Sequence, residues 1–209
     1  MPDPTDFMKS ISSEQLKLLD SVGDDAVHDA ARATMQLLGI SLEISAVKAH
    51  SVPASHVVDL VCNPEDLAVA LYLRVEGDAP GHAAFVCSEE RAFQIVDLLL
   101  CQPSGKTTYL DDLSTSALKE LGNILTSSYL NSLSRHTGLT FMPEPPQLAV
   151  DMAYALISTI MVGTVEGSFE AISIVTEFGQ NLGPLQGMFL YIPDSTGLWQ
   201  LINHLKEAA

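Results

Sequence analysis

The pattern of apolar and polar residues along the chain predicts two similar halves. In the first half, a helical period runs from Ser13 to Leu38, and Gly39 follows it as a helix-ending glycine. Shorter apolar runs bounded by turn residues then predict three strands, and a second helical period ends the half. We expect these strands at 41–47, 67–75 and 82–87, and the closing helix at 89–100.

The second half repeats this plan after a loop at 101–108. A long helical period covers residues 112–137, with Asp111 and Asp112 at its favourable N-terminal end and Gly138 after its last turn. The segment 143–146 holds three prolines, cannot continue a helix, and is predicted to be a rigid loop. The remaining elements are expected as strands at 156–165, 171–177 and 188–192 and a last helix at 196–206.

Comparison of the two halves indicates an internal repeat. A shift of 99 residues places Leu19 on Leu118, and a shift of 106 residues places Gly81 on Gly187. The further matches are Val22 with Leu121, Gly23 with Gly122, Gly39 with Gly138, Gln94 with Gln200, and Leu99 with Leu205. Strand pairs joined by short turns, with long helices covering them, predict an α+β fold with a mostly antiparallel sheet. We expect one domain over 1–209, built from pseudo-two-fold repeats at about 13–103 and 109–207.

The charge balance limits the classes of partner. The formal net charge is −16 at pH 7, which argues against binding nucleic acid through its phosphates. The longest uncharged apolar run, 152–165, is too short to cross a bilayer, and the N-terminus shows no secretory signal, so a cytoplasmic protein without membrane insertion is expected. The three cysteines and six histidines show no metal-ligand spacing, so we expect no metal or cofactor bound by this chain.

The second long helix carries the candidate chemistry on one face. At about 100° per residue, Glu120 and Asn123 lie within about 40° of Ser116 around the helix axis. Leu121 and Leu125 fall on the opposite side, so we expect the leucines to face the core and the polar trio to face outward. A solvated face without any chemistry has the same composition, and on these residues alone that interpretation stays open.

The spacing of the trio resembles the signature of the CheC family of response-regulator phosphatases. That signature is Asp or Ser, three residues, Glu, two residues, Asn, and a proline 23 positions later; the matching residues are Ser116, Glu120, Asn123 and Pro146. Segments at 71–77, 151–153 and 190–194 are also similar to the family, and the resemblance covers about 13–206. It implies a CheC-like fold, in which long helices pack on a central sheet.

The first half departs from this signature. The repeat places Lys17, Ser21 and Asp24 where a first active site would have its acid, its Glu and its Asn. Val47 stands where the proline would be. The resemblance therefore implies a degenerate first site and one active helix, in the second half.

For that active helix, the resemblance implies hydrolysis of the aspartyl phosphate on a CheY-like response regulator. Asn123 would then be the catalytic residue that orients the attacking water, and Glu120 would pair with the receiver's lysine. Ser116 is expected either to cap the helix or to contact the partner, and Pro146 to shape the loop beside the helix and to contact the partner. The Mg²⁺ of the reaction is expected on the receiver, and a CheD-type deamidase is a further expected partner.

Two other functions stay open. A CheC-like fold can bind a receiver, a CheD-type deamidase or a flagellar-switch component without catalysing hydrolysis, and it can be a structural subunit of the flagellar motor. The intact pair of Glu120 and Asn123 favours catalysis, because scaffolding alone would not require it.

Overall fold

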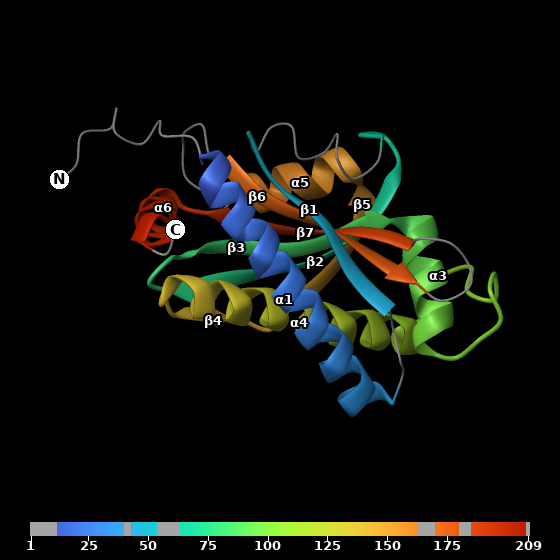
Figure 1. Cartoon of the computed structure of the whole chain (residues 1–209). Helices are drawn as coiled ribbons and strands as arrows, with labels where there is room; N and C mark the ends of the chain where they lie inside the picture. The colour runs from blue at the N-terminus through green and yellow to red at the C-terminus, as the bar shows by residue number, and fades with distance from the viewer. Residues whose placement is uncertain (1–11, 40–42, 54–62, 163–169, 180–184, 208–209) are drawn as a thin grey trace.

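A seven-stranded sheet lies between two layers of helices in the computed structural model (Figure 1). The long helices α1 (Ser13–Leu38) and α4 (Asp112–Thr137) cover one face together with α3 (Glu89–Leu99) and α6 (Ser195–Glu207). Of the helices that are described, α5 (Ala153–Val162) alone covers the opposite face. The residues that the structure describes are 12–39, 43–53, 63–162, 170–179 and 185–207.

Neighbouring strands of the sheet are antiparallel. The strand order is β1-β6-β7-β3-β2-β4, and β5 pairs with the same edge of β2 as β4 does. The strands are β1 (Glu43–Pro53), β2 (Leu67–Gly77), β3 (Gly81–Ser88), β4 (Phe141–Pro143), β5 (Gln147–Met152), β6 (Glu170–Gly179) and β7 (Leu185–Pro193).

The strand order is unchanged when the two halves are exchanged. β1 then takes the place of β4 and β5, β6 that of β2, and β7 that of β3. β3 and β7 pair at the centre of the sheet, in a register that puts Ala84 opposite Leu190. A two-fold relation between the halves requires that one residue of β3 lie opposite its own equivalent in β7. Ala84 and Leu190 are also related by the shift of 106 residues, so the register meets this requirement.

The long helices α1 and α4 have the predicted bounds because both ends are set by local signals. Each is 26 residues long, and the side chains of Ser12 and Asp111 accept a backbone N–H of the respective first turn. Gly39 and Gly138 follow the last turns with φ of 68° and 72°, a conformation that glycine adopts at little cost. Both pairs of caps are separated by the shift of 99 residues found in the sequence.

The inner face of α4 is packed tightly on β2. Leu118, Leu121 and Leu125 are completely buried there, as the helical pattern predicts. Gly122 lets the helix come close to the strand, since a Cβ at this position would lie 2.7 Å from Cδ1 and 3.0 Å from Cβ of Leu71. The distance between α4 and β2 at this point is therefore limited by the volume of the side chain at position 122.

The strand predicted at 156–165 is wrong, because residues 153–162 form helix α5. Leu156, Ile157 and Ile160 are buried with Ala153 at the spacing of one helix face, against the side of the sheet away from α4. The segment is apolar throughout, so its β-branched residues favoured a strand while its length allowed a helix. Residues 163–165 of the expected strand lie outside the described residues.

Two strands, β4 and β5, were not expected. They flank the proline-rich loop at the edge of the sheet and are largely exposed, so they lack the alternating burial that marks a strand in the sequence. β1 is also longer than predicted, since it pairs with β6 as far as Pro53, while residues 41–42 lie outside the described part. The other strands and helices agree with the prediction to within two residues at each end, apart from the N-terminal end of β7, which begins three residues earlier than predicted.

Candidate active site

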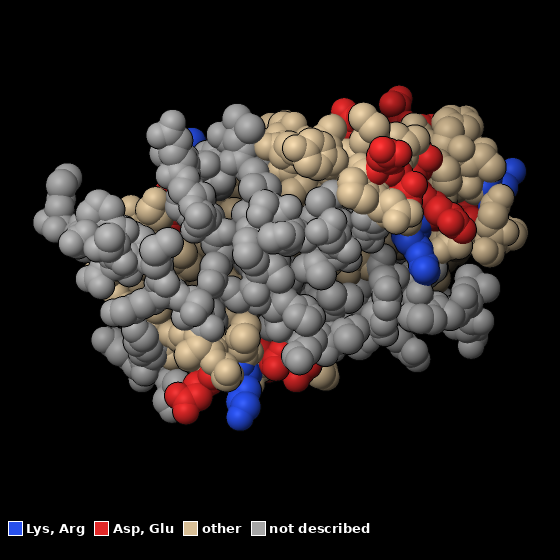
Figure 2. All heavy atoms as spheres, turned by 90° about the horizontal axis from the view of Figure 1, so that it is seen from above, with Lys and Arg blue, Asp and Glu red and all other residues tan. Residues whose placement is uncertain are grey.

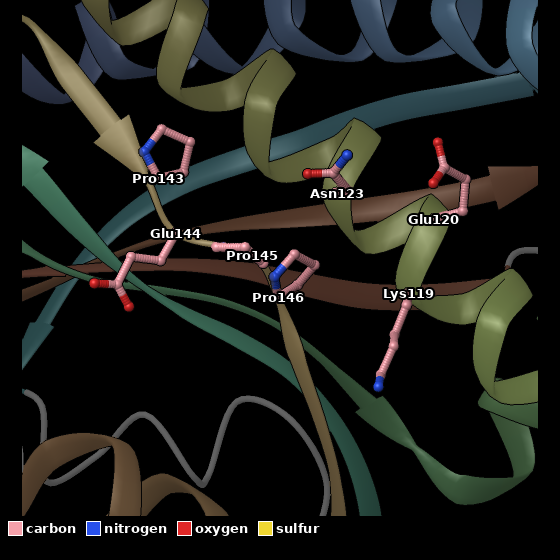
Figure 3. Close-up of a pocket in the computed structure, with 7 residues that line it drawn as sticks. All are labelled: Lys119, Glu120, Asn123, Pro143, Glu144, Pro145 and Pro146. Atoms are coloured by element: carbon pink, nitrogen blue, oxygen red, sulfur yellow. The ribbon is translucent and has the colours of Figure 1, made fainter.

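A groove of about 440 Å³ lies between α4 and the loop that joins β4 to β5 (Figure 3). Three of the residues expected at the site, Glu120, Asn123 and Pro146, lie in it together. The residues that line the groove are Lys119, Glu120, Asn123, Pro143, Glu144, Pro145 and Pro146. Two chain segments that are well separated in the sequence thus form its two walls.

Helix α4 presents Glu120 and Asn123 on its outer face, one turn apart (Figure 3). The side chain of Asn123 is exposed and that of Glu120 is half-buried. Leu121 and Leu125 on the inner face are completely buried, and burying each such side chain stabilises the fold by about 1.5–3 kcal/mol. This packing prevents the helix from rotating, so the carboxamide of Asn123 is held toward solvent.

The opposite wall is the proline-rich segment 143–146. Pro143 pairs with Val75 of β2, and the backbone N–H of Glu144 donates to the carbonyl oxygen of Arg74 at 2.9 Å. The prolines fix their own φ angles near −65°, and Pro146 is half-buried against the groove. The wall is therefore stiff, and it is tied to the sheet rather than to the helix.

Ser116, the remaining residue of the sequence signature, lies outside the groove on the exposed face of α4. It does not cap the helix, because Asp111 Oδ1 accepts the backbone N–H of Ser114 at 2.8 Å and its hydroxyl at 2.6 Å. These hydrogen bonds hold the pKa of Asp111 below its usual value, and the bond from the Ser114 hydroxyl contributes most. A contact between Ser116 and a partner stays a prediction.

Two charged residues of the groove, Lys119 and Glu144, were missed in the sequence. Both are exposed. Lys119 lies within about 40° of Asn123 around the helix axis, so the helical pattern contained the signal for it. Glu144 carried no such signal, since it reaches the groove only through the pairing of β4 with β2.

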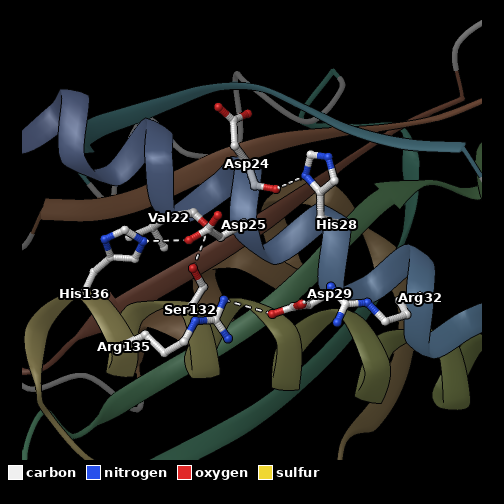
Figure 4. Close-up of polar contacts among 9 residues, drawn as sticks. All are labelled: Val22, Asp24, Asp25, His28, Asp29, Arg32, Ser132, Arg135 and His136. Carbon is white, nitrogen blue, oxygen red and sulfur yellow. Dashed lines mark hydrogen bonds and ion pairs between the residues drawn. The ribbon is translucent and has the colours of Figure 1, made fainter.

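Polar contacts hold α4 against α1 beyond the groove (Figure 4). His136 Nε2 lies 2.9 Å from Asp25 Oδ2, and Arg135 Nη2 lies 2.9 Å from Asp29 Oδ2. Exposed ion pairs of this kind contribute at most about 1 kcal/mol each. The hydroxyl of Ser132 is buried and donates at 2.9 Å to a backbone carbonyl of α1, so it adds a contact with fixed geometry.

The equivalent face of α1 lacks the features of the groove. Lys17, Ser21 and Asp24 are exposed, and the hydroxyl of Ser21 donates within the helix to the carbonyl of Lys17 at 3.4 Å. β1 continues through Val47, where its register with β6 shifts by one residue. In the second half, the register with β2 also shifts by one residue between β4 and β5. At that point, however, the chain leaves the sheet to form the proline loop.

Comparison with known proteins shows the family. A model of the CheC-like family matches residues 113–150. Over 154 residues, the chain is 33% identical to a Bacillus subtilis (strain 168) protein named CheY-P phosphatase CheC, covering 73% of this chain and 74% of that protein. The chain belongs to the CheC-like family.

Solved structures of low sequence identity share the fold of this CheC-like protein. Thermotoga maritima FliY has a TM-score of 0.76 at 17% identity, covering 96% of this chain and all of that one. The middle domain of Helicobacter pylori FliM has a TM-score of 0.65 at 13% identity, covering 93% of this chain and 99% of that one. The predicted α+β fold, with long helices on a mostly antiparallel sheet, is confirmed.

The surface of the CheC-like protein is rich in carboxylates. Figure 2 shows Asp and Glu side chains gathered near the end of the molecule that carries α3, with few Lys or Arg among them. With a formal net charge of −16, such a surface favours encounter with a basic partner. Within the described ranges, no three His, Cys, Asp or Glu side chains are placed to share a metal ion, and no helix is long and apolar enough to span a membrane.

Proposed function

We propose that this CheC-like protein accelerates hydrolysis of the aspartyl phosphate on a CheY-like response regulator, with Asn123 and Glu120 as its catalytic residues. The observation that carries the proposal is the placement of these two side chains on one outer helix face, in a groove, backed by fully buried leucines. Membership of the CheC-like family, with a relative named CheY-P phosphatase, supports the reaction class.

An exposed carboxamide suits this reaction because the phosphoryl group lies in the partner's own site. Asn123 can enter that site only if it projects from the surface, as it does here. An amide both donates and accepts hydrogen bonds and carries no charge that would repel the phosphoryl group. Its role is to orient the attacking water in line with the phosphorus atom. A hundredfold acceleration requires a barrier lower by about 2.7 kcal/mol, which positioning can supply.

Glu120 anchors the helix on the receiver in this proposal. Its carboxylate pairs with the lysine beside the receiver's acyl phosphate, and partial burial limits the number of side-chain arrangements that must be frozen on binding. The Mg²⁺ that neutralises the phosphoryl oxygens is bound by the receiver. The reaction then needs no nucleophile from this chain, since water attacks and the receiver's aspartate leaves.

The proline wall and Ser116 complete the contact with the receiver. Pro146 faces Asn123 across the groove, and the attachment of the loop to β2 keeps the groove open without a partner. A preformed surface loses less conformational freedom on binding. Ser116 lies farther toward the N-terminal end of the same face and contacts the receiver there. Binding of a CheD-type deamidase stays a prediction.

The test of Asn123 times the loss of phosphate from a phosphorylated receiver. Wild-type protein is expected to shorten the lifetime of the phosphoryl group, and Asn123→Ala to abolish this effect without lowering the unfolding temperature. Asp24→Ala is the matched control, because it removes the equivalent exposed side chain from α1 and is expected to leave the acceleration intact. If Asn123→Ala accelerated hydrolysis as wild type does, the assignment would be refuted.

A second variant tests Glu120. Glu120→Gln keeps the size of the side chain and removes its charge, so KM for the receiver is expected to rise about tenfold, with a smaller effect on kcat. An unchanged KM would contradict the pairing with lysine. Binding of the receiver by wild-type protein without any acceleration would identify a non-catalytic receiver-binding module instead.

A further inference from the structure

One leucine of α4 does not belong to the packed face. Of the six leucines in this helix, five are buried, whereas Leu113 is 61% exposed. At about 100° per residue, Leu113 lies within about 20° of Glu120 and about 80° of Asn123, which places it on the same outer face. The buried leucines are Leu118, Leu121, Leu125, Leu130 and Leu133.

Tyr109 adds a second exposed apolar side chain at the same end of the helix. It is 69% exposed and lies two residues before the N-cap, Asp111. A single exposed leucine is common on protein surfaces. Two large apolar side chains beside a candidate active face are typical of an interaction site, and tyrosine is enriched in such sites. We call Tyr109 and Leu113 the N-terminal patch of α4.

The patch lies within reach of any partner that docks on Asn123. Ten residues separate Leu113 from Asn123, which corresponds to about 15 Å along a helix. An interface of standard size covers about 800 Å² per partner, a disc of about 16 Å radius. A receiver centred on Asn123 therefore covers Leu113, unless it avoids this end of the helix.

We propose that the N-terminal patch of α4 is a second docking contact for the phosphorylated receiver, which supplies affinity and partner choice rather than chemistry. The proposal rests on the proposed function of Asn123 and Glu120. Asp111 and Asp112 border the patch, so the receiver surface that fits it has an apolar side chain flanked by Lys or Arg.

The charge of the chain favours a receiver over a second copy of the protein at this patch. A second copy would bring Asp111 and Asp112 against their own counterparts, together with another formal charge of −16. Like charges placed opposite one another in an interface cost several kcal/mol. The same carboxylates attract a partner with basic residues beside its phosphorylation site.

The test measures binding of receiver domains from the same organism, loaded with Mg²⁺ and beryllofluoride as a stable mimic of the phosphoryl group. Leu113→Ala is expected to weaken binding about fivefold and Leu113→Glu at least tenfold, since truncated apolar anchors cost 1 kcal/mol or more. In turnover, both variants are expected to raise KM and to change kcat little. A glutamate suits the first turn of a helix, so Leu113→Glu should fold normally.

Tyr154→Ala is the matched control, because Tyr154 is 64% exposed on α5, on the opposite side of the sheet. It should bind and turn over like wild type. Equal receiver affinity for wild type and Leu113→Glu would overturn the docking contact. Leu113-dependent binding without acceleration by wild type would keep the contact and overturn the phosphatase, and no binding by wild type would overturn both.

Discussion

Replacing Gly122 with alanine tests whether the close approach of α4 to β2 determines the position of the active helix. A glycine inside a helix is usually a weak point, and alanine there stabilises the helix by up to about 1 kcal/mol. Here we expect alanine to destabilise the protein instead. The new Cβ would lie 2.7 Å from Leu71 Cδ1 and 3.0 Å from Leu71 Cβ.

The magnitude follows from these two distances. Carbon atoms in contact are normally about 3.5–4.0 Å apart, so the helix and the strand must separate by about 0.5–1 Å. Leu71 is only 2% exposed and its Cβ is fixed to the backbone, so a change of rotamer relieves only part of the clash. Overpacking of this kind costs about 1–3 kcal/mol, which exceeds the gain in helix propensity. We expect Gly122→Ala to destabilise the protein by about 1 kcal/mol.

Thermal unfolding followed by circular dichroism measures the effect, as a decrease in Tm of about 2–4 °C for a chain of this size. Dephosphorylation of the receiver should fall too, because Asn123 is the next residue and moves with the helix. A double-mutant cycle with Leu71→Ala isolates the cause, since shortening Leu71 should remove most of the cost of Gly122→Ala. A rise in Tm for Gly122→Ala alone would refute the reasoning.

Three further predictions concern other parts of the chain. Asp97→Ala removes a buried carboxylate that accepts three hydrogen bonds from the loop after α3. It should lower the free energy of unfolding, measured in urea, by about 2–4 kcal/mol. An unchanged urea midpoint would contradict this prediction. The pKa of Asp111 is lowered on folding, so its stabilising effect is complete above the unfolded pKa and is lost as pH falls through the folded one. Asp111→Asn should therefore reduce the loss of stability below about pH 4, and an identical pH profile would argue against this. Restoring the signature in α1 with Lys17→Ser, Ser21→Glu and Asp24→Asn should not compensate for loss of the second site in the phosphatase assay, because β1 has no proline loop.

The long helices could be predicted from the sequence because their signals are local. Caps, helix-ending glycines and a leucine stripe all lie within the helix that they define. β5 could not be found in this way, since its exposed edge position follows from pairing with β2, far away in the sequence. The sequence predicts a strand where α5 lies, because a uniformly apolar segment is compatible with both periodicities and only its packing on the sheet decides between them.

The residues of the candidate site also differ in whether local sequence predicts them. Glu120 and Asn123 share a helix face, so their proximity could be inferred from spacing alone. The sequence indicates Pro146 only through resemblance to a family and gives no signal for Glu144, because both reach the groove through the hydrogen-bonded attachment of the loop to β2. Pairing between distant strands therefore positions the proline-rich wall of the site, which the spacing of residues along the chain does not predict.

On the long helices, the residues that pack in the core and the residues of the signature lie on opposite faces, so the two sets can change independently as such proteins diverge. In α1, Leu19 and Val22 are still completely buried, although Lys17, Ser21 and Asp24 no longer match the signature. Substitutions on an outer face leave the interior intact, so one copy of a duplicated helix can accumulate them without selection against misfolding. A duplicated fold of this kind can keep one working copy while the other drifts toward a different use.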